Sequence, residues 1–210
     1  MTDERFQDDR APRTGLSRRQ AFGMVGAGLL ALGLSACSQD DTLAKQARAG
    51  DNKNYVGGDG TVTEFAKDQR KGTKDFTGVL FDGAQVSEKD LVGSVTILNF
   101  WFASCAPCRL EAPELVKLHT EFAPKGVKFY GVNVRDEKAT AEAFEKSFGI
   151  TYPSFNDKDG QVLLAMAGIV PPNSVPATLV LDKQGRVSAR VVGELEGGTM
   201  RTLIQTVLAE

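Results

Sequence analysis

Beyond position 60, the apolar residues of this 210-residue chain come in short runs that polar and glycine-containing turns separate. Three runs rich in β-branched and aromatic residues are typical of buried strands: 95–102, 127–134 and 177–182. Three segments with apolar residues three and four positions apart predict helices: 109–118, 139–148 and 199–208. Strands that alternate with helices predict an α/β domain over residues 61–210, with helices on both faces of its sheet.

Shorter elements fill the gaps between these runs. They are a strand at 61–65, an extended piece at 153–155, a short helix at 161–167, and hairpins at 76–86 (turning on Asp82-Gly83) and at 177–192. The helix spacing also predicts which side chains face the core. Six residues are expected on the apolar faces of the first two helices: Leu110, Leu115, Leu118, Ala143, Phe144 and Phe148.

The motif Cys105-Ala106-Pro107-Cys108 lies where a predicted strand ends and a predicted helix begins. Free main-chain N–H groups and the positive end of the helix dipole favour a thiolate over a thiol at such a position. Cys105 is nearer the helix start and gains most from this field, while Cys108 lies one turn further in. The pair is expected to exchange disulfides, with Cys105 as the attacking thiol and Cys108 as the resolving one.

Other uses of a Cys-x-x-Cys pair fit the sequence less well. A zinc or copper site would need further ligands, and the chain offers only Cys37 and His119. A covalent haem site needs histidine directly after the second cysteine, where this chain has Arg109. A static disulfide across two residues would be a labile bridge over a very short loop. We therefore expect no metal, and no cofactor other than the redox-active Cys105–Cys108 disulfide.

Residues 1–36 have the pattern of an export signal. Arginines precede an apolar run at 21–34, which is shorter than the roughly twenty residues that a membrane span needs. The segment from Ser17 to Phe22 resembles a twin-arginine signal, and Leu34-Ser35-Ala36-Cys37 resembles the lipobox of bacterial lipoproteins. Cys37 is expected to be lipidated after cleavage and to anchor the chain to the outer side of the membrane. A plain uncleaved anchor is the alternative.

Residues 37–60 are polar and poor in large apolar side chains, so they cannot bury enough surface to fold alone. We predict a flexible tether here, with a strand around Tyr55-Val56 as the alternative. The formal net charge of −2 and the scattered Lys and Arg residues argue against nucleic-acid binding. The only histidine, His119, is expected at the surface or at a helix end, near the negative end of the dipole.

Residues 98–113, from Leu98 through the cysteine pair to Pro113, resemble the active-site block of the thioredoxin superfamily. A second block, 175–182, is similar to the strand that carries this superfamily's cis-proline. The segment 136–172 matches the insertion of the membrane-tethered TlpA and ResA branch. The resemblance, which covers residues 76–210, implies a thioredoxin-like fold. In that fold a central mixed sheet is flanked by helices, with an N-terminal hairpin and an inserted helix-containing segment.

The resemblance also implies roles for single residues. Glu111 would assist proton transfer and tune the thiols, with a solvated surface glutamate as the alternative. Pro176 would lie in cis geometry against the sulfurs, with an ordinary trans proline as the alternative. The main chain of Val175 would then bind an extended substrate strand. Trp101 would shield the disulfide or serve only as a core aromatic. Substrate contacts are expected from five residues: Trp101, Ser104, Ala106, Pro107 and Val175.

Two residues depart from the family's pattern. Ser104 stands where a tryptophan usually precedes the first cysteine, and this smaller side chain should open one wall of the site. Asn99 stands where cytoplasmic thioredoxins keep a buried aspartate. Because asparagine cannot titrate, Glu111 would be the residue that transfers the proton.

The resemblance implies an extracytoplasmic thiol-disulfide oxidoreductase that reduces disulfides of exported proteins, for example in cytochrome c maturation. Such an enzyme needs exported protein thiols as partners and a membrane-bound electron donor. The direction of exchange does not follow from Ala106-Pro107, because about 30 mV, or about 1.4 kcal/mol, already changes it. Two other functions stay open: a thiol peroxidase of the same superfamily, and a non-catalytic lipoprotein that binds a ligand.

Overall fold

The computed structural model describes residues 55–57, 60–171 and 173–210. Within these residues a seven-stranded sheet has the order β1-β2-β9-β8-β5-β6-β7. Its strands are β1 (Tyr55–Gly57), β2 (Gly60–Glu64), β5 (Thr96–Trp101), β6 (Lys128–Asn133), β7 (Ser154–Asn156), β8 (Ala177–Leu181) and β9 (Val187–Val192). Strands β5, β6 and β7 pair in parallel and the other neighbours pair antiparallel, so the sheet is mixed as expected.

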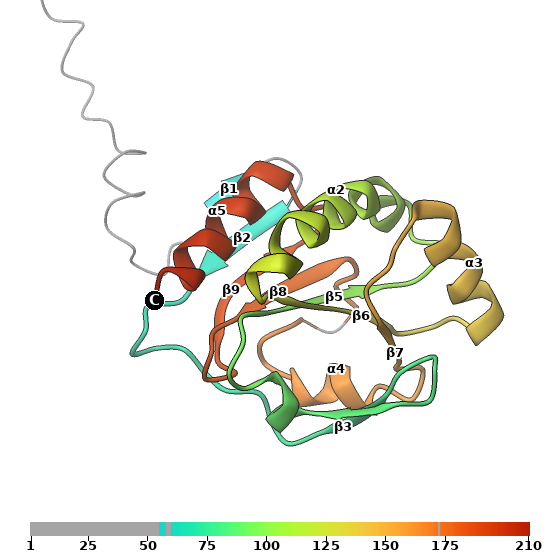
Figure 1. Ribbon diagram of the computed structural model, residues 1–210, viewed down its shortest axis with the longest axis horizontal. Helices are drawn as coiled ribbons and strands as arrows, with labels where there is room; N and C mark the ends of the chain where they lie inside the picture. Colours follow the sequence, from blue (N-terminus) through green and yellow to red (C-terminus); the bar gives the residue numbers. More distant parts are fainter. Residues whose placement is uncertain (1–54, 58–59, 172) are drawn as a thin grey trace, which may run out of the picture. The chain divides into compact units, whose positions relative to one another are not determined.

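Helices cover both faces of this sheet (Figure 1). They are α2 (Ala106–Phe122), α3 (Lys138–Phe148), α4 (Gln161–Ala165) and α5 (Gly197–Leu208), with 3-10 turns at Glu88–Leu91 and Ala123–Lys125. In Figure 1, α2, α3 and α5 lie on one side, and α4 lies on the other beside the hairpin of β3 (Thr77–Val79) and β4 (Gln85–Ser87). The predicted thioredoxin-like architecture, with its hairpin and its helix-containing insertion, is confirmed.

The sheet separates two apolar clusters. On one face, Leu115 of α2 and Leu203 of α5 pack with Ile97 of β5. On the other face, Val162 of α4 packs with Phe100 of β5. Alternate residues of one strand thus enter different clusters, because successive side chains of a strand point to opposite faces. Every residue of β5 is buried, which explains its continuous apolar run.

Two of the expected apolar positions are wrong. Leu110 is 64% exposed, and Ala143 lies on the exposed side of α3. The helix α2 begins at Ala106, before the predicted start, and its buried side runs through Cys108, Ala112 and the two predicted leucines further on. A helix buries one stripe, and a spacing that includes Leu110 selects the neighbouring stripe.

At the N-terminal end of the described part, a strand lies within the predicted tether. Strand β1 pairs with β2, which pairs in turn with β9, so the end of the predicted tether takes part in the sheet. This is the alternative noted for Tyr55-Val56, and it follows from main-chain pairing, which needs no apolar side chains. The predicted signal peptide, the lipidated Cys37 and the rest of the tether lie outside the described residues. In the described part, no helix is long and apolar enough to cross a membrane.

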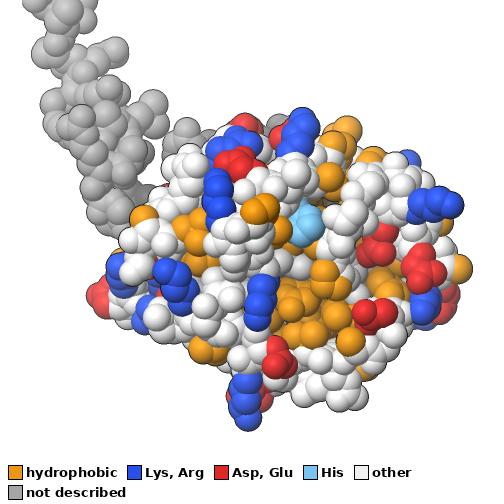
Figure 2. All heavy atoms as spheres, viewed as in Figure 1, with side chains coloured by type: hydrophobic (Ala, Val, Ile, Leu, Met, Phe, Trp, Pro, Cys, Tyr) orange, Lys and Arg blue, Asp and Glu red, His pale blue; other side chains and the backbone are white. Residues whose placement is uncertain are grey.

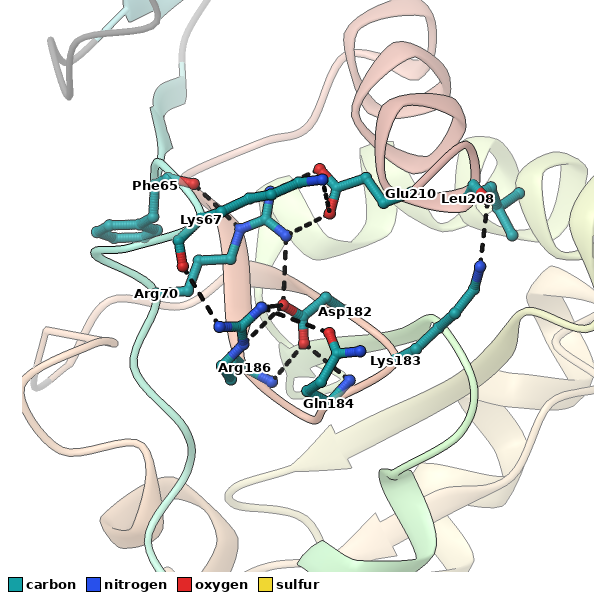
Figure 3. Close-up of polar contacts among 9 residues, drawn as sticks. All are labelled: Phe65, Lys67, Arg70, Asp182, Lys183, Gln184, Arg186, Leu208 and Glu210. Atoms are coloured by element: carbon teal, nitrogen blue, oxygen red, sulfur yellow. Dashed lines mark hydrogen bonds and ion pairs between the residues drawn. The ribbon is translucent and has the colours of Figure 1, made fainter.

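A network of charged side chains surrounds Asp182, at the end of the sheet where β5 begins (Figure 3). Arg70 donates to Asp182 at 3.2 Å and to Glu210 at 2.6 Å, and Arg186 also bonds Asp182. Asp182 follows β8, whose last residue pairs with the first residue of β5. A cavity of about 210 Å³ lies here, lined by Lys67, Asp182, Lys183, Gln184, Arg186, Val207 and Glu210. We assign this network to stability, since it joins three separate segments of the chain.

Candidate active site

Cys105 and Cys108 form a disulfide, with their Cα atoms 5.3 Å apart. The residues between Trp101, where β5 ends, and α2 form a short loop, and Cys105 is the N-cap of the helix. Its sulfur accepts the main-chain N–H of Cys108 at 3.2 Å. Pro107 stands in the first turn, where its missing N–H leaves no hydrogen bond unmade. The sequence therefore predicted both the pair and its place at a helix N-terminus.

The two cysteines are buried, Cys105 with 5% and Cys108 with 2% of its surface accessible. Ser104, Ala106 and Pro107, three of the predicted contact residues, are exposed on either side of Cys105. A partner can therefore contact this rim before it reaches a sulfur.

The peptide bond between Val175 and Pro176 is cis, as the resemblance implied. Pro176 directly precedes β8, and its carbonyl accepts the N–H of Gly193 at 2.9 Å. The sulfur of Cys105 lies 4.0 Å from the carbonyl oxygen of Val175. The structure thus brings the second predicted block against the first, beside the sulfur of Cys105.

Trp101 is 3% exposed and packs in one cluster with both cysteines. Its ring stacks on Phe144 of α3, with centroids 4.5 Å apart and planes inclined by 27°. A residue of the inserted segment therefore covers the tryptophan. Trp101 is a core aromatic, and it also forms part of the apolar surroundings of the disulfide.

Glu111 is buried one turn after Cys108, with 1% of its surface accessible. Its Oε1 accepts from Nδ2 of Asn99 at 2.7 Å, and its Oε2 accepts from the N–H of Leu195 at 3.1 Å. Burial raises the pKa of Glu111 from 4.5 to about 8, against the lowering effect of these two hydrogen bonds and with a further rise from Glu194. The alternative of a solvated glutamate is wrong.

Asn99 fixes the carboxyl group from the sheet side. The same Nδ2 also donates to the hydroxyl of Thr178 at 3.0 Å, so β8 takes part in the site through a polar side chain. Tyr152 is buried nearby, and burial, followed by the charge of Glu111, raises its pKa. Glu111 is thus an ionisable carboxyl group whose hydrogen-bonding partners, the amide of Asn99 and the N–H of Leu195, are neutral.

His119 lies in the last turn of α2, as expected, and away from this carboxyl group. Its ring packs edge-on against Phe129 and Tyr152, with centroids 5.3 Å away in each case, and Nδ1 is 3.3 Å from the hydroxyl of Thr151. Burial lowers the pKa of His119. Among the residues that the structure describes, no three metal-ligating side chains gather at one point.

Four contacts at the site were missed by the sequence analysis: those of Thr178, Leu195, Arg109 and Asp136. Thr178 was hidden in an apolar strand, although a lone hydroxyl in such a run signals a buried hydrogen bond. Leu195 contributes only its main chain, which leaves no trace in the sequence. Arg109 and Asp136 contact the loop before Cys105 and are considered below.

The fold and the bonded cysteine pair define a thioredoxin-like protein with a redox-active site. A family model described as "AhpC/TSA family" matches residues 70–190, and the chain belongs to this family. The thiol-disulfide oxidoreductase ResA of Geobacillus thermodenitrificans is 31% identical over 133 residues, which cover 63% of this chain and 74% of that protein. ResA of Bacillus subtilis is 34% identical over 114 residues, 54% of this chain and 62% of that protein.

Solved structures agree with this assignment. A secreted thiol-disulfide isomerase from Corynebacterium glutamicum has a TM-score of 0.67 and 29% identity, covering 75% of this chain and 98% of that one. A DsbF homologue from Corynebacterium diphtheriae has a TM-score of 0.61 and 31% identity, covering 72% and 96%. With the cysteines bonded at the helix start, the chain is a thiol-disulfide oxidoreductase.

Proposed function

We propose that this oxidoreductase reduces disulfides of exported proteins, with Cys105 as the attacking thiol and Cys108 as the resolving thiol. One observation carries the proposal: the sulfur of Cys105 caps the N-terminus of α2 and accepts the N–H of Cys108 at 3.2 Å. A thiolate at this sulfur would be stabilised by that N–H and by the helix dipole.

The reaction proceeds in two exchanges. The thiolate of Cys105 attacks one sulfur of the partner's disulfide, that bond breaks, and the partner's other sulfur leaves as a thiolate that takes a proton. Cys108 then loses its proton and attacks the sulfur of Cys105, which releases the partner's second sulfur. Two electrons pass to the partner, and the enzyme is left with the Cys105–Cys108 disulfide.

Glu111 would supply and accept the proton that Cys108 exchanges. Its carboxyl group lies one helical turn from Cys108, and its pKa of about 8 is close to that of a thiol. Pro176 and the carbonyl of Val175 would border the partner strand, since that carbonyl lies 4.0 Å from the attacking sulfur. Trp101, Ser104, Ala106 and Pro107 would form the remaining contacts.

The location and the partners extend this proposal. The relatives named ResA and the secreted isomerase support action outside the cytoplasm, and apocytochromes c are the partner class that we favour. A lipid on Cys37 would hold the enzyme at the membrane, where a membrane-bound donor would reduce it again. Figure 2 shows charged side chains of both signs scattered over one face of the described part. Such a mixture creates no extended positive potential on this face that would attract nucleic acid.

A trapping experiment tests the exchange. In cells, a Cys108→Ser variant should accumulate mixed disulfides through Cys105, because the second exchange cannot occur. Cys105→Ser is the matched control and should trap nothing. The purified, dithiol-reduced protein should also reduce insulin. Consumption of peroxide without disulfide exchange would instead support a thiol peroxidase. Absence of both activities, with a cellular function that survives replacement of both thiols, would support a binding protein.

A second experiment tests the anchor. Cys37→Ser should leave the precursor uncut and unlipidated, and membrane fractions from labelled cells should show no acylated chain. A variant that is still cut and still sediments with membranes would reject the lipid anchor, without touching the proposal for the cysteine pair.

A further inference from the structure

Ala103 lies two residues before Cys105, in the loop between β5 and α2, and charged side chains hold both of its main-chain groups. Its N–H donates to Oδ2 of Asp136 at 2.6 Å. Its carbonyl accepts from Nη1 of Arg109 at 3.4 Å. The loop that carries the attacking sulfur is therefore tied to the segment after β6 and to the first turn of α2.

Asp136 is itself held in place by the sheet. Nδ2 of Asn133 donates to the same oxygen, Oδ2, at 2.9 Å. Oδ1 of Asn133 accepts the main-chain N–H groups of Arg135 at 3.1 Å and of Asp136 at 2.8 Å. Because Asn133 is the last residue of β6 and is fully buried, the position of the carboxylate is set by the end of this strand.

Two neighbouring contacts run in register with this one. The N–H of Val134 donates to the carbonyl of Trp101 at 3.2 Å. The guanidinium of Arg135 lies 3.8 Å from the centroid of the Phe102 ring. Residues 134–136 thus contact residues 101–103 one after another, so contacts between the two segments continue past the last paired residues, Trp101 and Asn133, as far as Ala103.

We propose that Asp136 is a positioning residue for disulfide exchange: by holding the N–H of Ala103, it keeps Cys105 at the N-terminus of α2 once the disulfide is open. The proposal rests on the function proposed above and deepens it. In the oxidised protein, the bond to Cys108 also fixes the sulfur of Cys105. After reduction that restraint is absent, and the contacts of Ala103 carry more of the restraint on the loop.

The hydrogen bond that Asp136 accepts from Ala103 and the negative charge of Asp136 have opposite effects on the thiolate of Cys105. The bond favours the thiolate, because it keeps the sulfur near the free N–H groups of α2. The negative charge disfavours a second negative charge nearby. Asp136→Asn separates the two effects: both hydrogen bonds end on Oδ2, so one amide oxygen can accept both while the charge is lost. Asp136→Ala loses the charge and both bonds.

The comparison is therefore between Asp136→Asn and Asp136→Ala, which are both uncharged at position 136. Each is made in the full-length chain with Cys37→Ser, so that only the active-site thiols titrate. The readouts are the absorbance of the Cys105 thiolate against pH and the rate of exchange with glutathione disulfide. Asp136→Ala should show a higher Cys105 pKa than Asp136→Asn and should react about fivefold to tenfold more slowly at neutral pH. Asp136→Asn should react at least as fast as the parent.

Asp90→Ala is the matched control, because it removes an exposed carboxylate that accepts the N–H of Ser87 at 2.7 Å away from the site. It should match the parent in both readouts. If Asp136→Ala does not fold, Asp136→Ser replaces it, because the serine side chain is one bond shorter than that of aspartate. Equal titration and equal rates in the Asn and Ala (or Ser) variants would overturn the proposal. A parent protein that does not exchange at all would instead reject the proposed function.

Discussion

Nδ2 of Asn99 lies 2.7 Å from Oε1 of Glu111, and the two side chains share a buried site next to the cysteine pair. Asn99 belongs to β5 and Glu111 to α2, so one strand and the helix after it carry both the thiols and the carboxyl group. The helix start favours a thiolate, while the buried carboxyl group favours its own neutral form. Proton exchange between the two is the chemistry that this arrangement permits.

Glu111→Gln should flatten the dependence of stability on pH. The pKa of Glu111 is about 8 in the folded protein and about 4.5 when unfolded. Between these values the folded state holds a proton that the unfolded state has lost, so the parent loses stability as pH rises. The slope is at most about 1.4 kcal/mol per pH unit, and it ends above pH 8. Urea unfolding of the oxidised protein at several pH values measures it.

Glu114→Gln is the matched control on the same helix, since Glu114 is partly exposed and pairs with Lys117 at 2.6 Å. It should keep the slope of the parent. In the reduced protein, Glu111→Gln should also lower the apparent thiol pKa values, because a negative charge beside them is removed. Thiol titrations that overlay those of the parent would contradict a role for Glu111 in exchange.

Much of this fold follows from local sequence. The runs around Phe100 and Val132 are apolar on both sides, and such runs occur where helices cover both faces of a sheet. The cysteine pair and its place before a helix could also be predicted, because both depend on neighbouring residues. The cis geometry of Pro176 needed the resemblance to a family, since a proline alone does not define it.

The interior of the site could not be predicted in the same way. Asn99 and Thr178 are far apart in the sequence and meet only because β8 pairs with β5. The N–H of Leu195 reaches Glu111 through a loop whose path depends on the whole sheet. Exposure of Leu110 likewise depends on which stripe of α2 the sheet covers, and the predicted apolar face, which included Leu110, was the neighbouring stripe.

Alkylation of the reduced protein should label Cys105 before Cys108. Both thiols are buried, but Cys105 caps the helix and its neighbours Ser104 and Ala106 are exposed. Its thiolate should therefore form at lower pH and be reached first. Brief treatment with iodoacetamide at mildly acidic pH, followed by peptide mass spectrometry, gives the order. Label on Cys108 in preference to Cys105 would reverse the assigned roles.

Gly131→Ala should destabilise the protein and disturb the surroundings of Trp101. A Cβ atom at this position would lie 2.2 Å from Oγ of Ser154 and 2.7 Å from Nε1 of Trp101, both of them buried. We expect a loss of about 1–3 kcal/mol, as for other overpacked cores. Trp101 is the only tryptophan, so a shift in its emission reports the change directly.

Gly72→Ala is the control for this substitution, because a Cβ atom there would meet nothing within 4 Å. Its unfolding midpoint and tryptophan emission should match those of the parent. If Gly131→Ala behaved in the same way, the packing between β6, β7 and the tryptophan would be looser than described.

Asn99→Asp should place a second carboxyl group against the first. The introduced oxygen would take the place of Nδ2, which lies 2.7 Å from Oε1 of Glu111, in a site with almost no access to water. Two carboxylates at this distance cannot both be charged, so the pair should keep at least one proton at neutral pH. A protonated member can still donate to its neighbour, and the introduced group can accept from the hydroxyl of Thr178.

The sign of the effect follows from proton counting. Above about pH 4.5 the folded variant would hold up to two protons that the unfolded chain has lost. Its stability should therefore fall with pH up to twice as steeply as that of the parent, by at most about 2.7 kcal/mol per pH unit. Near pH 4 the variant and the parent should have similar stability.

Adding Glu111→Gln to Asn99→Asp removes one of the two groups and should restore a slope of the parental size. Urea unfolding at pH 4, 6 and 8 of the parent, both single variants and the double variant completes the cycle. Additive effects of the two substitutions at pH 8 would show that the groups at 99 and 111 titrate independently, against the shared site described here.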